Sequence, residues 1–177
     1  MKHVYLLAFC ILTTLLSEAQ DSSKIIKLLD GRMQIKIPSI FHSMTAEEYQ
    51  FKYHKPKDVT EAYSDKNLEL NILVSYQQSM PVTEDQLQEL VTSMIVQMKT
   101  KNPNFKVLGE GEKSINGHVY SFLKFSSQGA DQPIFNYHLL GAVNKKLIMF
   151  VFNCPEKLTA GWYPKVETMW NSIVQKK

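Results

Sequence analysis

One dipeptide, Asn116-Gly117, carries the clearest structural signal in this chain. Both residue types adopt positive φ at low cost, and Asn-Gly between stretches suited to strands is the strongest short-range signal for a two-residue β-hairpin. Residues 113–115 precede the dipeptide and residues 118–125 follow it, and both stretches suit strands. An antiparallel strand pair is therefore predicted, which limits the chain to folds that contain a sheet.

Two further turns predict hairpins. Asp30-Gly31 leads into residues 33–37, which alternate strictly between apolar and polar, as a strand with one buried face does. Asn144-Lys145 leads into residues 147–152, whose continuous apolar content predicts a central strand covered on both faces. The paired stretches are residues 24–29 with 33–37, and residues 134–143 with 146–154.

Two more strands are expected on either side of the turn Asp65-Lys66-Asn67, over residues 61–64 and 68–76. In the second strand, alternate apolar residues share one face, and Leu73 lies on the other. Another strand is expected over residues 105–108, and the polar residues 126–133 predict a surface loop. The residues expected on the shared face are Leu68, Leu70, Ile72, Val74 and Tyr76.

Helical signals lie between and after these strands. Thr45 with Glu48 matches a capping box that predicts a short helix to about Tyr53. Thr83 with Gln86 matches a second box, and the apolar residues that follow have the spacing of one helical face. They are Leu87, Leu90, Val91, Met94, Ile95 and Met98.

A last helix is predicted from about Gly161 to Gln175, with Pro164 tolerated in its first turn. Its apolar face holds two tryptophans, Trp162 and Trp170, which we expect in the core and not around a ligand. Hairpin-linked strands combined with amphipathic helices predict an α+β fold. We expect an antiparallel β-sheet of about six to eight strands with amphipathic helices packed on both faces, an α/β/α sandwich.

Residues 1–19 match the three regions of a cleavable secretory signal peptide. Lys2 gives the basic start, residues 4–16 form the apolar run, and Ser17 and Ala19 give small side chains before the cleavage site. A membrane anchor is the alternative, but the run is shorter than the about 20 apolar residues that cross a bilayer. Residues 20–177 are then expected as one secreted or periplasmic domain.

The cysteines support the same interpretation. Cys10 lies inside the apolar run behind bulky Phe9, which disfavours a lipoprotein signal. Removal of the signal leaves Cys154 as the only cysteine, so no intrachain disulfide is expected in the exported domain. Cys154 ends an apolar stretch, where a thiol behaves as a small hydrophobe.

The order of these features resembles the PsbP-like group, the small extracytoplasmic α/β sandwiches that include DcrB-like proteins. The resembling stretches are residues 33–38, residues 114–118 before an aromatic strand, and the ending from Asn144-Lys145 through Cys154-Pro155 to the helix with two tryptophans. The resemblance covers nearly all of residues 20–177. It implies accessory, adaptor or chaperone roles for other proteins, and it implies no catalytic residue.

No catalytic, cofactor-binding or metal-binding residue is assigned. The sequence has no G-x-S-x-G elbow and no phosphate loop, and its histidines lack the spacing of a zinc site. Glu110 with Glu112, and Glu47 with Glu48, are expected on solvated surfaces and at a helix start. The histidines of the exported domain are His42, His54, His118 and His138.

Charge excludes one further class of function. The formal net charge is only +3, and Arg32 is the sole arginine, whereas nucleic-acid readers favour arginine forks. We therefore expect no nucleic-acid partner, no cofactor and no enzyme activity. The first hypothesis is an exported accessory or binding protein that docks on another envelope or secreted protein. The alternative is a small-ligand carrier or enzyme with a pocket around Tyr120, Phe122 and His138.

Overall fold

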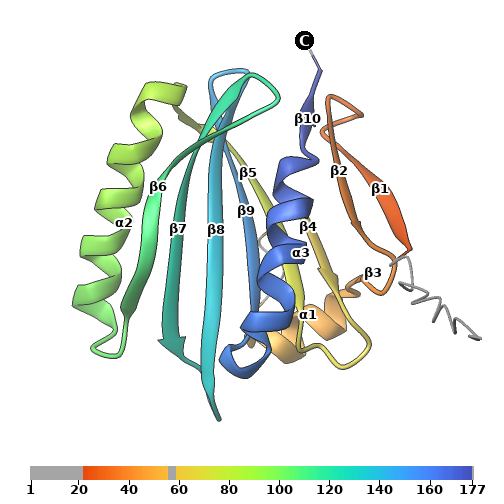
Figure 1. Ribbon diagram of the computed structural model, residues 1–177, viewed down its shortest axis with the longest axis vertical. Helices are drawn as coiled ribbons and strands as arrows, with labels where there is room; N and C mark the ends of the chain where they lie inside the picture. The colour runs from red at the N-terminus through yellow and green to blue at the C-terminus, as the bar shows by residue number, and fades with distance from the viewer. Residues whose placement is uncertain (1–21, 56–58, 177) are drawn as a thin grey trace, which may run out of the picture.

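The computed structural model describes residues 22–55 and 59–176. The predicted signal peptide lies outside the described residues. Within them, seven antiparallel strands form the main sheet in the order β3-β4-β5-β9-β8-β7-β6 (Figure 1). Their bounds are β3 (His42–Ser43), β4 (Glu61–Ser64), β5 (Asn71–Pro81), β6 (Lys106–Ile115), β7 (His118–Gln128), β8 (Pro133–Val143) and β9 (Lys146–Pro155).

The two predicted tight hairpins of this sheet are confirmed. Asn116 and Gly117 join β6 to β7 with φ of 50° and 84°, and Asn144 and Lys145 join β8 to β9 with φ of 51° and 57°. Positive φ at both central residues is the geometry of a type I′ turn, whose twist matches that of the strands. The Asn116 side chain also donates a hydrogen bond to the Ile173 carbonyl at 2.6 Å, which ties this turn to the C-terminal segment.

The predicted N-terminal hairpin forms a separate small sheet. It consists of β1 (Ser23–Leu28) and β2 (Met33–Pro38), with β10 (Val174–Gln175) on the other side of β2. Its turn is longer than the dipeptide predicted, because Leu28 pairs with Met33 and leaves four residues between the strands. Leu29, Asp30 and Gly31 all have positive φ in this turn.

Helices cover both faces of the main sheet, as predicted. The described residues form three α-helices, α1 (Ala46–Tyr53), α2 (Leu87–Lys101) and α3 (Thr159–Asn171). The small sheet and α3 bury one face, which we call the α3 face. Figure 1 shows α3 in front of the strands, with the small sheet beside it. The opposite α2 face packs against α2 over β7 and β8, and against α1 near β4.

Both predicted capping boxes are present. Thr45 and Glu48 exchange backbone and side-chain hydrogen bonds at the start of α1. Thr83 and Gln86 form the second box, but it opens a short 3₁₀ turn, η1 (Glu84–Gln86), that leads into α2. Leu87, Val91 and Ile95 of the predicted helical face are buried, and Leu90, Met94 and Met98 are half-buried around them.

The C-terminal prediction was partly wrong. After the 3₁₀ turn η2 (Glu156–Leu158), α3 begins at Thr159 and ends at Asn171, and β10 occupies the residues assigned to its last turn. Pro164 therefore lies inside the helix and not in its first turn. Pro164 cannot donate the helical hydrogen bond to the Ala160 carbonyl, and both residues are exposed, so this break in the bonding pattern lies at the surface. Trp170 is fully buried and Trp162 half-buried in the α3-face core, as predicted.

Two strand boundaries also differ from the predictions. Leu68 adopts positive φ in the turn and packs with Leu73 on the α2 face, whereas Leu70, Ile72 and Val74 pack on the α3 face. The predicted surface loop 126–133 is shorter, because β7 continues to Gln128 and β8 begins at Pro133. Residues 106–108 and 113–115 belong to one strand, β6, with a bulge between Val107 and Gly109, and residue 105 lies just before it.

Candidate functional site

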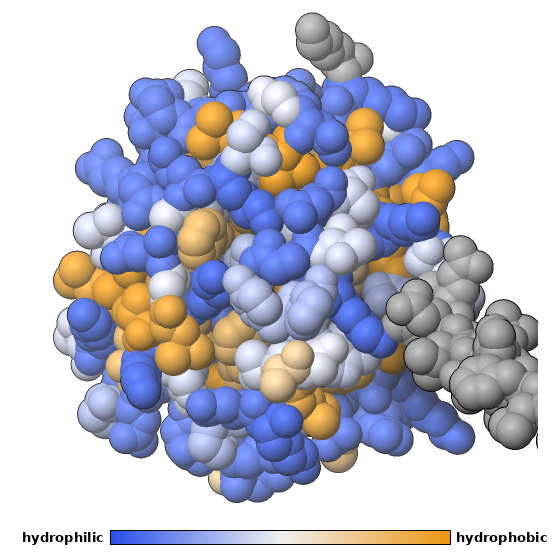
Figure 2. Space-filling view, viewed as in Figure 1, coloured by the Kyte–Doolittle hydropathy of each residue, from blue (hydrophilic) through white to orange (hydrophobic). Residues whose placement is uncertain are grey.

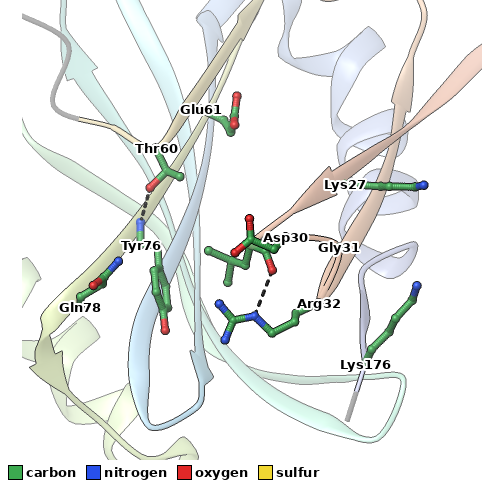
Figure 3. Close-up of a pocket in the computed structure, with 10 residues that line it drawn as sticks. Lys27, Asp30, Gly31, Arg32, Thr60, Glu61, Tyr76, Gln78 and Lys176 are labelled. Carbon is green, nitrogen blue, oxygen red and sulfur yellow. Dashed lines mark hydrogen bonds between the residues drawn. The ribbon is translucent and has the colours of Figure 1, made fainter.

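A polar cleft of about 760 Å³ lies between the small sheet and the β4–β5 side of the main sheet (Figure 3). Arg32, in the turn just before β2, donates from Nε to the Leu29 carbonyl at 3.0 Å, which holds its guanidinium at the cleft. Figure 3 shows Arg32 extending toward Tyr76, while Lys27 and Lys176 point the other way. The cleft therefore combines one oriented guanidinium and two lysines with the carboxylates of Asp30 and Glu61.

Basic residues are concentrated on the small sheet beside this cleft. The small sheet with its flanking residues, 22–38 and 172–176, carries five basic side chains and one acidic one, Asp30. Its formal charge of +4 exceeds the +3 of the whole chain, so the rest of the chain is close to neutral. The basic residues are Lys24, Lys27, Arg32, Lys36 and Lys176.

The small sheet also has an open side. β1 is an edge strand, since β2 is its only partner strand among the described residues. On its outer surface Ile25 is 62% exposed, directly opposite exposed Lys36 of β2. An edge strand presents unpaired backbone groups to another chain, and an exposed apolar side chain beside cations suits a docking surface.

The C-terminal segment completes this surface. The Lys176 backbone N–H donates to the Arg32 carbonyl at 2.7 Å, and the Lys36 N–H donates to Ser172 Oγ at 2.9 Å. These bonds hold β10 against β2 and place Lys176 at the cleft. Sequence reasoning missed this site because it assigned residues 172–175 to a helix. Lys24, Lys27 and Lys36, with Arg32 among them, were the available signal.

The three residues proposed for a ligand pocket do not meet. Tyr120 and Phe122 belong to the core of the α3 face, whereas His138 packs edge-on against Phe125 of the α2 face, with ring centroids 4.9 Å apart. Side chains of adjacent residues on a strand alternate between faces, so the main sheet separates them. The predicted pocket around Tyr120, Phe122 and His138 was therefore wrong.

The space around Phe122 is filled by the protein itself. Lys124 Nζ lies 4.8 Å from the Phe122 ring centroid and 5.1 Å from that of Tyr163 on α3. Lys124 Nζ also donates to Tyr163 Oη at 2.9 Å. Nearby Glu167 of α3 accepts from Tyr137 Oη at 3.0 Å. Burial and the Glu167 charge raise the Tyr137 pKa well above its ordinary value, so this hydroxyl stays protonated.

Two histidines pair with carboxylates at helix starts. His118 Nδ1 lies 2.9 Å from Glu84, which also accepts from the Val119 N–H at 2.9 Å and so ties η1 to β7. His42 Nε2 lies 3.1 Å from Glu48 of the first capping box. Hydrogen bonds from the Thr45 backbone and from His42 lower the Glu48 pKa. Both pairs fasten local structure at the surface.

The remaining candidate groups are placed as follows. Cys154 is buried as predicted, and burial raises its pKa to about 11, so the thiol is protonated at neutral pH. Glu110 and Glu112 are exposed on edge strand β6. Among the described residues, no cluster of three His, Cys, Asp or Glu side chains could hold a metal ion. Within the same residues, no helix has the length and apolarity needed to span a bilayer.

No family model and no curated protein matches this sequence. Several solved structures do match it in fold. Cyanobacterial PsbP (CyanoP) from Synechocystis sp. PCC 6803 matches with a TM-score of 0.63 at 15% identity, over 88% of this chain and 93% of that one. LpqN, involved in cell envelope biogenesis of Mycobacterium tuberculosis, matches at 0.58 with 7% identity, over 88% and 91%.

The Saccharomyces cerevisiae Ran-binding protein Mog1p matches with a TM-score of 0.53 at 12% identity, over 87% of this chain and 95% of that one. At such identities the likeness concerns the fold alone. The predicted resemblance to the PsbP-like sandwich is therefore confirmed at the level of the fold. This chain has the α+β sandwich fold that CyanoP, LpqN and Mog1p share.

Proposed function

We propose that this protein is an exported, non-catalytic accessory protein that docks on an acidic segment of another envelope or secreted protein. The observation that carries the proposal is the concentration of positive charge on the small sheet. Charge complementarity steers association and selects partners. A guanidinium fork held at a cleft suits a carboxylate, because the two groups match in geometry.

The shape of the surface favours a protein partner. Edge strand β1 offers backbone hydrogen bonds to an extended segment, a recognised mode of peptide binding. Exposed Ile25 offers an apolar contact beside Lys36. Mog1p, which has the same fold, is described as Ran-binding, so this sandwich serves protein recognition in at least one other case.

The remaining chemistry of the described residues is consistent with binding. The Cys154 thiol is buried and protonated, and the two histidine–carboxylate pairs lie at helix starts, where they hold local structure. Nucleophilic catalysis requires an activated nucleophile beside its base. Recognition by a charged surface requires only that the side chains are held in place.

Site-specific photo-crosslinking in the native envelope tests the proposal. A photoreactive residue at Gln34 of β2 is expected to capture a defined protein, and one at Thr100 of α2 is not. The double variant Lys27→Glu/Lys36→Glu should weaken the adduct about 10-fold. The matched control Lys99→Glu/Lys101→Glu, which reverses two exposed charges at the end of α2, should leave it unchanged. Equal loss in both variants, or no adduct at Gln34, would overturn the proposal.

Export is tested separately by the mass of the mature protein. Cleavage after Ala19 predicts a chain that begins at Gln20, without added lipid. A retained residue 1, or a mass increase that matches acyl chains, would contradict this part of the proposal. That result would leave the small-sheet surface as a binding site but would change the compartment of its partner.

A further inference from the structure

Arg32 is fixed at both its backbone and its side chain. The Leu29 carbonyl accepts two hydrogen bonds from it, from the backbone N–H at 3.1 Å and from Nε at 3.0 Å. The Arg32 carbonyl in turn accepts from the Lys176 N–H at 2.7 Å. Leu29 takes part through a positive φ of 51°, which is uncommon for a bulky residue. The two Nη groups of Arg32 form no hydrogen bond with the described residues, so an oriented fork of donors is open to another molecule.

The cleft also contains two carboxylates that do not pair with Arg32. Asp30 lies in the same turn, and Glu61 lies across the cleft on β4, where it accepts from Tyr63 Oη at 3.4 Å. Figure 3 shows Arg32 and Glu61 coming from the small sheet and from the main sheet. Within the described part of the chain, none of the charged side chains that line the cleft forms an ion pair. Separated charges of both signs suit a ligand that carries both signs, because each charge then gains a partner.

The two carboxylates also limit which acidic segments can enter the cleft. A run of adjacent acidic residues is attracted by Lys27 and Lys36 of the small sheet, but a second carboxylate inside the cleft would meet Asp30 or Glu61. Like charges brought together in this way suppress binding of the wrong partner. A basic residue next to the acidic one replaces this repulsion by attraction.

We propose that the cleft is the specificity-determining part of the docking surface and binds a pair of opposite charges in the partner's segment. Arg32 binds the carboxylate of one aspartate or glutamate through both Nη groups, a geometry that lysine cannot reproduce. Asp30 and Glu61 bind the side chain of a lysine or arginine close to that residue in the segment. This inference rests on the docking proposal and specifies which acidic segments the surface accepts, namely those that a basic residue interrupts.

Nuclear magnetic resonance titration with three capped pentapeptides tests this selectivity. The first peptide, acetyl-Gly-Glu-Gly-Lys-Gly-amide, carries the charge pair, and the other two have glutamine or glutamate in place of the lysine. The first should bind with a dissociation constant of about 1 mM and shift the Arg32 Nε–H signal. The glutamine and glutamate peptides should bind about 5-fold and about 10-fold more weakly. Equal affinities, tightest binding of the peptide with two acidic residues, or no shift with any peptide would overturn the inference.

Variants that keep the fold separate the fork from simple charge. Arg32→Lys keeps the charge and removes the fork, so it should weaken binding of the charge-pair peptide about 10-fold. Lys27→Arg is the matched control, which also keeps its charge and should leave the affinity unchanged. Asp30→Asn/Glu61→Gln should abolish the preference for the lysine peptide over the glutamine peptide, and asparagine tolerates the positive φ at position 30. Unchanged amide signals in β8 and β9 report an intact fold.

The same variants in the crosslinking experiment distinguish this inference from the docking proposal. Arg32→Lys should weaken the adduct at Gln34 about 10-fold, whereas Lys27→Arg should not. An adduct that depends on Lys27 and Lys36 but persists in Arg32→Lys would leave the docking surface in place and overturn the role of the cleft. No adduct in the wild-type protein would overturn the docking proposal, and the peptide titration would then decide the selectivity of the cleft alone.

Discussion

Gly141 of β8 lies directly beneath the ring of Tyr120, so close that an added Cβ would meet ring atoms at 2.4 and 2.7 Å. We predict that Gly141→Ala lowers the free energy of unfolding by ~1–3 kcal/mol, because the buried ring has no space to move away. Gly161→Ala is the matched control. A Cβ at this exposed helical position meets nothing within 4 Å, and the change should stabilise α3 by ~0.5–1 kcal/mol.

Urea unfolding measures both changes, and the double variant Gly141→Ala/Tyr120→Leu provides a rescue. The smaller leucine removes the ring that the new methyl meets, so the loss caused by Gly141→Ala should be smaller in the Tyr120→Leu background. Equal losses in the two backgrounds would show that the glycine is needed for another reason.

His138 makes the stability depend on pH. Burial lowers its pKa to about 4, below the 6.5 of an exposed imidazole. The unfolded chain therefore binds this proton more tightly, so the contribution of neutral His138 is complete above pH ~6.5 and is lost as the pH falls toward 4. The full contribution is ~3 kcal/mol.

We predict that His138→Gln reduces the difference in unfolding free energy between pH 7 and pH 4.5 by ~2–3 kcal/mol. His118→Gln is the control, since His118 is half-exposed and paired with Glu84. Carboxylates with lowered pKa, such as Glu48, also make the unfolding free energy fall in acid. The pH difference of each variant is therefore compared with that of the wild type. A pH dependence in His138→Gln equal to that of the wild type would refute the role of this ring.

At the scale of elements, the turn at Asn116 has two separable functions, its positive φ and its side-chain bond to Ile173. Asn116→Gly keeps the first and removes the second. We predict a loss of ~0.5–1.5 kcal/mol, together with faster hydrogen exchange of the β10 amides. Asn144→Gly, in the corresponding turn between β8 and β9, should leave β10 exchange unchanged. Equal rates of hydrogen exchange at the β10 amides in both variants would show that the bond from Asn116 to Ile173 does not hold β10 in place.

The same elements show how far sequence reasoning reaches. Local turn chemistry and capping boxes act over a few residues, so the three hairpins and two helix starts were predictable. The end of α3 was not, because residues 174–175 pair with β2, about 140 positions earlier in the chain. Leu68 was misplaced because positive φ at that residue interrupts the period-two pattern. Tertiary pairing and backbone geometry overrode local periodicity in both places.

The candidate sites were less predictable than the fold. The basic residues of the small sheet are spread over both ends of the chain, and only the pairing of β10 with β2 gathers them. Periodicity did assign Cys154 and the tryptophans to the core, because burial follows from the apolar residues around them.

At the scale of the whole molecule, the central strands and the small sheet differ in what holds them. β8 and β9 have a partner strand on each side and carry core residues on both faces, whereas β1 is an edge and β10 has two residues. Amides in such central strands exchange only when the whole protein unfolds, whereas amides in edge strands exchange through local opening.

We therefore predict that hydrogen exchange is slowest in β8 and β9 and much faster in β1 and β10. Binding of a partner along β1 would add hydrogen bonds to that edge, so its amides should become protected in the complex while exchange in β8 and β9 stays limited by global unfolding. Hydrogen-exchange mass spectrometry of the free protein and of the crosslinked complex measures both states. Protection that appears on α2 and not on the small sheet would move the docking surface to the α2 and β6 side. Val96 and Leu108 are exposed there, and Figure 2 shows apolar residues gathered on that side.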